Sequence, residues 1–237
     1  MSLLVVTGTG TGVGKTVVTA ALAALTLARG ARCAVVKPAQ TGEADGALGD
    51  LATVRGLSGC SDLHELVRYP DALSPAAAAR RSGRPALDQA AALDLLLRLS
   101  DRDLVLIEGA GGLLVRYDED GLTLADLARV VRAPVLVVVD AGLGTLNATA
   151  LTLEALAHRG LELAGVVIGS WPAKPGLAER SNLRDLATLA ARPLLGVLPA
   201  GAGSLPVGDF LAAAGAGLGP QLGGSFDARA FQARHSG

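Results

Sequence analysis

A glycine-rich segment near the amino terminus carries the residues best suited to chemistry. It reads Gly8-Thr9-Gly10-Thr11-Gly12-Val13-Gly14-Lys15-Thr16, between an apolar strand-like run and a helix-like run. Glycines let the backbone curl so that its N–H groups converge on an anion, and the start of the helix adds partial positive charge. The Lys15 ammonium would reach the β- and γ-phosphates of a nucleotide, and the Thr16 hydroxyl would hold Mg²⁺. The segment predicts a phosphate-binding loop, one residue longer than the common form, which has glycine where this chain has Thr9.

Lysine usage singles out two positions. The chain has three lysines, Lys15, Lys37 and Lys174, against eighteen arginines. Lys15 comes after the glycine-rich segment that follows the first strand-like run, and Lys37 ends the second run. A lysine is a compact point charge that approaches a phosphoryl group end-on. We therefore expect Lys15 and Lys37 to have specific roles. The alternative for Lys37 is an ordinary solvated charge at a strand end.

An acidic residue ends a third apolar run, in Ile107-Glu108-Gly109-Ala110-Gly111-Gly112. This is the place of a Walker-B-like Mg²⁺ ligand, and the glycines after it would let the backbone close on a ligand. The alternative role for Glu108 is an acid that caps a helix. Asp140 ends the next apolar run in the same way and is the second candidate for a metal ligand.

Short apolar runs alternate with helix-period stretches along the chain. The runs are Leu3–Thr7, Cys33–Lys37, Leu104–Glu108, Val135–Asp140, Leu163–Ile168 and Leu194–Leu198. The stretches are Lys15–Arg29, Leu87–Leu99, Leu122–Val131, Leu146–Arg159 and Leu177–Ala190. This alternation predicts an α/β fold, a mostly parallel sheet with helices on both faces, as one P-loop domain over residues 1–237. Ligands of such sheets bind beyond the carboxyl ends of the strands. From about residue 215 the chain is glycine-rich, and we expect a loosely ordered tail.

Composition excludes several classes of protein. The net charge of −1 and the aromatic content of 3% argue against nucleic-acid binding. Two cysteines build neither a disulfide framework nor a four-ligand zinc site, which favours reduced thiols in a cytoplasmic protein. No apolar run is long enough to span a bilayer, and no targeting signal is found, so we expect no membrane association.

Four motifs, in order and at strand ends, resemble the dethiobiotin synthetases of biotin biosynthesis. They are Thr7–Thr16, Lys37-Pro38-Ala39-Gln40-Thr41-Gly42, Glu108–Gly112 and Leu143-Gly144-Thr145-Leu146-Asn147. The resemblance covers about the first 200 residues, and the longer phosphate loop is the form that this family uses. It implies a ligase that joins CO₂ to 7,8-diaminononanoate and closes a cyclic urea, with ATP cleaved to ADP and phosphate. A carbamate and a carbamic-phosphoric mixed anhydride would be the intermediates.

The resemblance also implies roles for individual residues, with Lys37 and Lys15 as the catalytic cations. Phosphates and nucleotide would be bound by Gly12, Val13, Gly14, Lys15, Thr16, Val17, Asp50, Glu108, Gly109, Ala110, Gly111, Gly169, Ser170, Pro199, Ala200 and Gly201. Substrate would contact Thr11, Lys37, Thr41, Gly144, Thr145, Leu146 and Asn147. Mg²⁺ would be held by Thr16, Asp50 and Glu108. Spacing alone does not choose Asp50 over Glu43 and Asp45, but Asp50 begins a helical stretch, Asp50–Leu57, where the acid of the family lies. The family is a homodimer whose sites are completed by the partner subunit.

Two departures from the family pattern bear on specificity. Gly12 stands where relatives often carry Glu. Ser170, after Gly169, stands where many relatives place an Asn that reads adenine. A serine hydroxyl cannot make the paired contact of an amide. ATP is the expected co-substrate, but other nucleoside triphosphates are possible.

Two other functions share this ATPase core. A cobyrinate-type synthetase carries a further glutamine-hydrolysing domain, for which 237 residues leave no room. A partitioning or switch ATPase typically has a signature lysine early in the loop, where this chain has Gly10. Both remain alternatives at this point.

Overall fold

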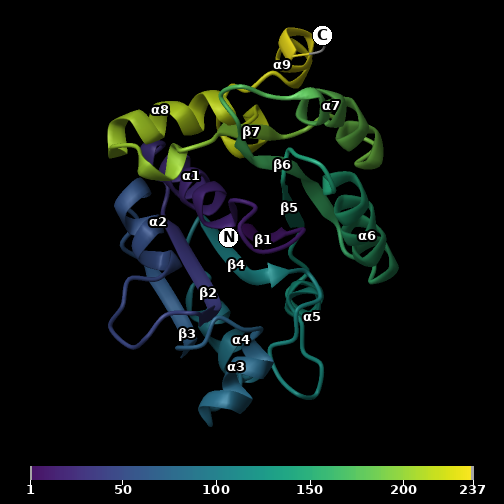
Figure 1. The fold of residues 1–237 in the computed structure, drawn as a ribbon. Coiled ribbons are helices and arrows are strands. Elements are labelled where there is room, and N and C mark those ends of the chain that lie inside the picture. The colour runs from purple at the N-terminus through teal and green to yellow at the C-terminus, as the bar shows by residue number, and fades with distance from the viewer. Residues whose placement is uncertain (1, 236–237) are drawn as a thin grey trace.

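A computed structural model describes residues 2–235. The strands of these residues form one seven-stranded sheet in the order β3-β2-β4-β1-β5-β6-β7, and every pair of neighbouring strands is parallel. The α/β fold with a mostly parallel sheet is therefore confirmed. Figure 1 shows β1 near the middle of the sheet, with β5, β6 and β7 to one side of it and β4, β2 and β3 to the other.

The strands are β1 Ser2–Gly8, β2 Cys33–Thr41, β3 Leu63–Tyr69, β4 Leu104–Gly112, β5 Val135–Val139, β6 Leu163–Trp171 and β7 Gly196–Pro199. The helices are α1 Lys15–Ala28, α2 Asp50–Ser58, α3 Pro75–Ser82, α4 Gln89–Arg98, α5 Leu124–Val130, α6 Thr145–His158, α7 Leu177–Leu189, α8 Val207–Gly217 and α9 Ala228–His235. Two short 3₁₀ turns, Ala202–Ser204 and Pro220–Leu222, flank α8.

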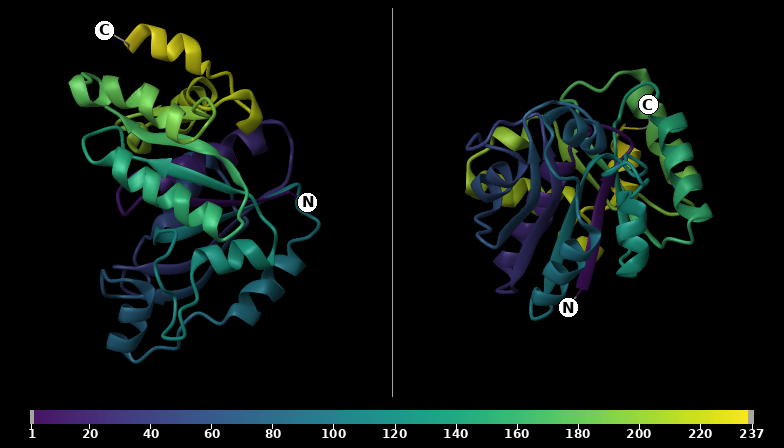
Figure 2. Two further views of the ribbon diagram at one scale, coloured as in Figure 1. Left: turned by 90° about the vertical axis from the view of Figure 1, so that its right-hand side faces the viewer. Right: turned by 90° about the horizontal axis from the view of Figure 1, so that it is seen from below.

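The sheet lies between two layers of helices, which the view from below in Figure 2 shows edge-on. Side chains of α1, α2 and α8 pack on one face, where Val18, Leu57 and Phe210 are buried. Side chains of α3 to α7 pack on the other, where Leu127 and Leu186 are buried. Successive Val, Leu and Ile side chains of the central strands point alternately into the two cores. Both faces of these strands are therefore buried, and neither faces water.

The six predicted strands and five predicted helices are all present, with ends shifted by a few residues. Helix α2 matches the expected helical stretch Asp50–Leu57, whereas the prediction did not include β3, α3, α8 and α9. Strand β3 is an edge strand that contains His64, Glu65 and Arg68, and its half-buried polar residues hide the apolar run. Helix α8 contains three glycines, and its helical form depends on burial of Phe210 and Ala214 against α1.

The carboxyl-terminal residues differ from the expected loose tail. Phe226 is buried, and Phe231 of α9 meets the Trp171 ring edge-on at a centroid distance of 5.3 Å. Aromatic contacts of this kind tie a terminal helix to the body of the protein. The last part of that prediction, residues 236–237, lies outside the described residues.

Candidate active site at the carboxyl edge of the sheet

The phosphate loop connects β1 to α1 and has a strongly curled backbone. Gly12 and Gly14 have φ angles of 81° and 97°, a region that glycine adopts without strain. Gly14 is the N-cap of α1, so the first N–H groups of that helix face the loop. The Lys15 ammonium donates to the Gly10 carbonyl at 2.8 Å and so lies across the loop. This is the geometry that an anion-binding loop requires.

The backbone of strand β6 packs directly against the backbone of the phosphate loop. A Cβ atom placed on Gly169 would lie 2.0 Å from the Val13 carbonyl oxygen, closer than any real contact. A Cβ atom on Gly14 would in turn lie 2.7 Å from the Gly169 carbonyl oxygen. The predicted nucleotide residue Gly169 therefore lies directly against the phosphate loop.

A buried cluster of charges lies beside the loop. The Lys37 ammonium is 2.8 Å from Glu108 Oε1 and 2.5 Å from Asp50 Oδ2, and it also donates to the Gly109 carbonyl at 3.2 Å. The Thr16 hydroxyl donates to Glu108 Oε1 at 2.9 Å. The cluster joins β2, α2, β4 and α1, which are distant in sequence and adjacent at the carboxyl edge of the sheet.

The charges of the cluster depend on one another. Burial alone would disfavour the ammonium form of Lys37, but Glu108 and Asp50 outweigh burial and raise its pKa. Burial likewise opposes ionisation of Asp50, but the Lys37 ammonium more than offsets it and lowers the pKa of the carboxyl. Burial, assisted by the nearby charge of Lys37, lowers the pKa of Lys15. At neutral pH Lys37 is a fixed cation paired with an Asp50 carboxylate.

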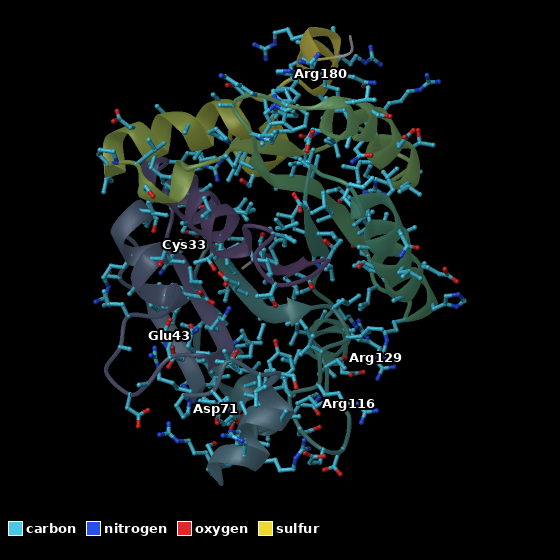
Figure 3. All side chains as sticks on the ribbon, viewed as in Figure 1. Cys33, Glu43, Asp71, Arg116, Arg129 and Arg180 are labelled. Atoms are coloured by element: carbon cyan, nitrogen blue, oxygen red, sulfur yellow. The ribbon has the colours of Figure 1, made fainter. Side chains whose placement is uncertain are left out.

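The structure separates the three acids that sequence spacing left open. Asp50 begins α2 and pairs with Lys37. Asp45 is exposed and pairs with Arg84 at 2.8 Å. Glu43, labelled in Figure 3, is half-buried in the loop between β2 and α2 and lines the cavity, with no side-chain hydrogen bond among residues 2–235. Asp140 caps its own loop, accepting from the Ala141 N–H at 2.6 Å.

A cavity of about 360 Å³ opens between the phosphate loop and the cluster. Of the predicted residues it is lined by Thr11, Gly12, Gly14, Lys15, Thr16, Val17, Lys37, Thr41, Asp50, Ala110 and Gly111. Sequence reasoning did not assign Ala39 or Gln40, which also line it. The signal for them was present, because both belong to the Lys37–Gly42 motif. Glu108 and Gly109 are buried beneath this cavity. Both accept hydrogen bonds from the Lys37 ammonium, and Lys37 itself lines the cavity.

A second cavity of about 390 Å³ adjoins the first. The two share Thr11, Thr41, Ala110 and Gly111 as lining residues. The far side of the second cavity is formed by Ala72, Leu73, Ser74, Pro75 and Val115, which present mostly apolar atoms. A molecule with a polar end in the first cavity and an alkyl chain in the second would fit this arrangement.

The other predicted nucleotide residues lie on the opposite side of the loop from the Lys37 cluster. Ser170 is half-buried next to Gly169 on β6, and Pro199, Ala200 and Gly201 are exposed where β7 ends. The Ala200 N–H donates to the Trp171 carbonyl at 2.7 Å, which holds the two strand ends together. None of these four residues lines the two cavities, whereas Val13 packs into the core beneath the loop.

The predicted substrate residues Gly144, Thr145, Leu146 and Asn147 form the start of α6, away from both cavities. Gly144 is the N-cap with a φ of 94°, and the Thr145 hydroxyl donates to the Asp140 carbonyl at 2.7 Å. Asn147 is exposed. Within one chain the structure does not bring this group to the Lys37 cluster.

The donor set of the cluster fits a magnesium ion. Glu108 Oε2 is buried and has no hydrogen-bond partner, while Asp50 and the Thr16 hydroxyl lie beside the same lysine and loop. Mg²⁺ typically takes one or two carboxylates and completes its shell with water and substrate phosphates. Residues 2–235 hold no group of three or more His, Cys, Asp or Glu side chains that would bind a metal alone. The cluster is therefore suited to a metal that arrives with a nucleotide.

Known proteins with related sequences were compared with the chain. A family model described as an AAA domain matches residues 2–204. The ATP-dependent dethiobiotin synthetase BioD of Frankia casuarinae is 67% identical over 236 residues, with 99% of each chain covered. The protein of the same name from Streptomyces coelicolor is 54% identical, again with 99% of each chain covered. The chain belongs to the dethiobiotin synthetase family.

Solved structures support the fold of this dethiobiotin synthetase family member. The septum site-determining protein MinD of Pyrococcus horikoshii, described in complex with Mg-ADP, superposes with a TM-score of 0.54 at 15% identity and 94% coverage of both chains. FtsY of Mycoplasma mycoides gives a TM-score of 0.57 at 16% identity, covering all of this chain and 67% of the other. At such identities the likeness shows a shared fold alone.

Proposed function

We propose that this protein is an ATP-dependent ligase that converts 7,8-diaminononanoate and CO₂ to dethiobiotin, releasing ADP and phosphate. The observation that carries the proposal is the Lys37–Glu108–Asp50 cluster beside the phosphate loop, in a chain 54–67% identical to named dethiobiotin synthetases over nearly its full length. The cobyrinate-type and switch-ATPase alternatives have no comparable support. The likeness to MinD, at 15% sequence identity, is a likeness of fold alone and favours neither of them.

The phosphate loop and Lys15 bind the triphosphate. The curled backbone from Gly10 to Lys15 directs N–H groups to the phosphates, and the α1 N-terminus adds partial positive charge. The Lys15 ammonium, which contacts the Gly10 carbonyl, is long enough to move to a phosphate oxygen. Burial lowers the pKa of Lys15 because it disfavours the ammonium form, and an anionic phosphate oxygen beside Lys15 would stabilise that form.

Lys37 supplies fixed positive charge where the phosphoryl group is transferred. One amine of the substrate captures CO₂ as a carbamate, the γ-phosphoryl group moves to a carbamate oxygen, and the second amine attacks the carbonyl as phosphate leaves. The carbamate, the phosphoryl group in transfer and the mixed anhydride are all anionic near the reacting atoms, so electrostatic stabilisation is the main requirement of the site. Lys37 is held in place by two carboxylates and a carbonyl and needs no rearrangement.

Thr16, Asp50 and Glu108 would hold Mg²⁺ with the nucleotide. When bound, the ion neutralises phosphate charge and fixes the orientation of the β- and γ-phosphates. The unpartnered Glu108 Oε2 supports this role, since a buried carboxylate oxygen without a donor is costly. These three residues come from α1, α2 and β4, so they assemble only when the sheet edge is folded.

The diamine would occupy the two joined cavities. Thr11 and Thr41, which line both, would contact its polar end, and the apolar wall at Leu73, Pro75 and Val115 suits its alkyl chain. Among residues 2–235, no charged side chain lines the second cavity, where the distant carboxylate would lie. We propose a homodimer in which Gly144–Asn147 of the partner provide an α6 N-terminus and a side-chain amide for it.

The nucleotide base would lie beyond the loop, near Ser170 and residues 199–201. Gly201 to Ser204 turn back over the start of α1, where Gly203 lies against Val17. The groups available there are one hydroxyl and backbone, so ATP is proposed as co-substrate with weak selection of the base. No helix among residues 2–235 is long and apolar enough to cross a membrane. We propose a cytoplasmic location, which fits two free cysteines.

The reaction is tested with purified protein and a phosphate-release assay. Phosphate should appear only when ATP, Mg²⁺, bicarbonate and diaminononanoate are all present, and dethiobiotin should form in equal amount by mass spectrometry. Each component is left out in turn as a control. Equal phosphate release without the diamine would refute the synthetase and favour a switch ATPase.

A further inference from the structure

Gln40 is a buried amide in β2, three residues after Lys37, with an exposed fraction of 5%. Its side chain is hydrogen-bonded at both ends. Oε1 accepts from the Asp50 backbone N–H at 2.9 Å, and Nε2 donates to the Thr41 carbonyl at 3.1 Å. The side chain thus joins β2 to the first residue of α2, across the eight-residue connection formed by residues 42–49.

The start of α2 has little other support. Its N-cap is Gly49, which has no side chain to accept from the first N–H groups of the helix. Gln40 Oε1 takes over that task from outside the helix. The fit is close, because a Cβ atom on Gly49 would lie 2.8 Å from Gln40 Oε1 and 2.9 Å from Arg68 Nη2.

The loop before α2 is fixed independently by two arginines, Arg68 of β3 and Arg84 of the connection between α3 and α4. Arg68 donates to the Ala47 carbonyl at 2.9 Å, and Arg84 pairs with Asp45. These contacts hold the middle of the loop at its exposed side. Among residues 2–235 the Asp50 N–H donates only to Gln40, and the Asp50 carboxylate is 2.5 Å from the Lys37 ammonium.

We propose that Gln40 is a positioning residue for Asp50: it accepts the N–H of the first residue of α2, which directs the Asp50 carboxylate to Lys37 and the metal site. The proposal rests on the proposed role of Asp50 as a ligand of nucleotide-bound Mg²⁺. Groups that orient metal-binding carboxylates typically contribute 10- to 100-fold to metal affinity. The rest of the nucleotide site, made by the phosphate loop, does not depend on this contact.

The test measures ADP binding by calorimetry, once with Mg²⁺ and once with EDTA. In Gln40→Met, which keeps side-chain length but removes the amide, ADP affinity with Mg²⁺ should fall about tenfold and affinity in EDTA should stay unchanged. A merely structural role would lower both affinities or neither. The matched control is Ser58→Ala, which removes buried hydrogen bonds at the other end of α2 and should leave both affinities unchanged.

A double-mutant cycle shows whether Gln40 acts through Asp50. Asp50→Asn alone should lose the Mg²⁺-dependent part of ADP affinity, and adding Gln40→Met should then cause little further loss, because coupled residues are not additive. The positioning role is wrong if Gln40→Met leaves ADP affinity with Mg²⁺ unchanged, or if it lowers ADP affinity equally in EDTA. It is also wrong if Gln40→Met still lowers ADP affinity tenfold when Asp50 is already replaced by Asn. If Asp50→Asn itself keeps normal Mg²⁺ dependence, the proposed metal role of Asp50 fails instead.

Discussion

At the scale of single residues, the site depends on a cation that is buried because two acids surround it. Lys37 has an exposed fraction of 3%, and Glu108 is fully buried. Neither charge would be stable there alone, because an unpaired buried ion is costly. The same pairing leaves the ammonium charged at the pH of the cell and fixed in place, which is what stabilisation of a transferred phosphoryl group requires.

Replacement of Lys37 tests this role directly. Lys37→Ala should lower kcat by about 10²- to 10³-fold, the usual effect of removing one electrostatic stabiliser. The midpoint of thermal unfolding should also fall, since Glu108 and Asp50 lose their shared partner, so rates are measured well below that midpoint. Lys174→Ala removes the exposed lysine and is the matched control. A folded Lys37→Ala enzyme with near-native turnover would show that the lysine has no catalytic role.

Asp50 should make stability depend on pH in the acidic range. Its pKa is lowered from 3.8 on folding, because Lys37 outweighs the opposing effect of burial. The contribution of the Asp50 carboxylate to the free energy of unfolding is therefore complete above about pH 5, and it is lost as the pH falls through the folded-state pKa. The difference in unfolding free energy between wild type and Asp50→Asn should shrink below pH 4, by a modest amount because 35% of the side chain is exposed. Urea titrations from pH 3 to pH 7 measure it, and a constant difference would contradict the expectation.

Ser170 should leave the choice of base weak. An asparagine amide pairs with both a donor and an acceptor of adenine, whereas one hydroxyl makes a single contact. Loss of such a paired contact costs about 1–3 kcal/mol of discrimination, or roughly 5- to 150-fold. ATP, GTP, CTP and UTP should therefore give comparable kcat/KM under one condition, and Ser170→Asn should raise the preference for ATP. A preference of wild type for ATP above about a thousandfold would mean that another group reads adenine.

At the scale of elements, strand β6 and the phosphate loop are in backbone contact that only glycine permits. Gly169→Ala would force its new Cβ against the Val13 carbonyl, 2.0 Å away in the present geometry. The loop must move, so we expect ADP affinity to fall at least tenfold. Gly56→Ala, in the exposed middle of α2 with no atom within 4 Å of the new Cβ, is the control. It should leave ADP affinity unchanged and stabilise the fold by roughly 0.5–1 kcal/mol. Normal ADP affinity in a folded Gly169→Ala protein would contradict the close contact.

The elements also show what sequence could predict. Strands buried on both faces, such as Val135–Val139, are continuous apolar runs and were found, as was the loop whose glycines precede Lys15. Edge strand β3 was missed because its residues are mostly half-buried and include His64, Glu65 and Arg68, which interrupt the apolar run. The pairing of Lys37 with Asp50 and the hydrogen bond between Gln40 and Asp50 could not be read from spacing, because both depend on how α2 docks against β2.

At the scale of the whole molecule, the two halves of the predicted substrate site lie apart. The Lys37 cluster and its cavities involve β1, β2 and β4, whereas Gly144–Asn147 begin α6 and line neither cavity. Leu143, beside this group, has an exposed fraction of 94%, and Leu151 on the same helix 59%. Exposed leucines next to a predicted binding group favour a contact between copies of the chain. In a two-fold dimer, each copy would complete the site of the other.

Mixing two inactive variants tests this arrangement. Lys37→Ala removes the cation of one half-site, and Asn147→Asp places a negative charge where the substrate carboxylate should bind. If each site combines both halves, a mixed dimer holds one doubly altered site and one intact site, so random pairing in an equal mixture should restore about a quarter of wild-type activity. Sedimentation of the wild type should first show a dimer, and each variant alone is the control. A monomer, or a mixture no more active than the mean of the two variants, would show that each chain builds its whole site from its own residues.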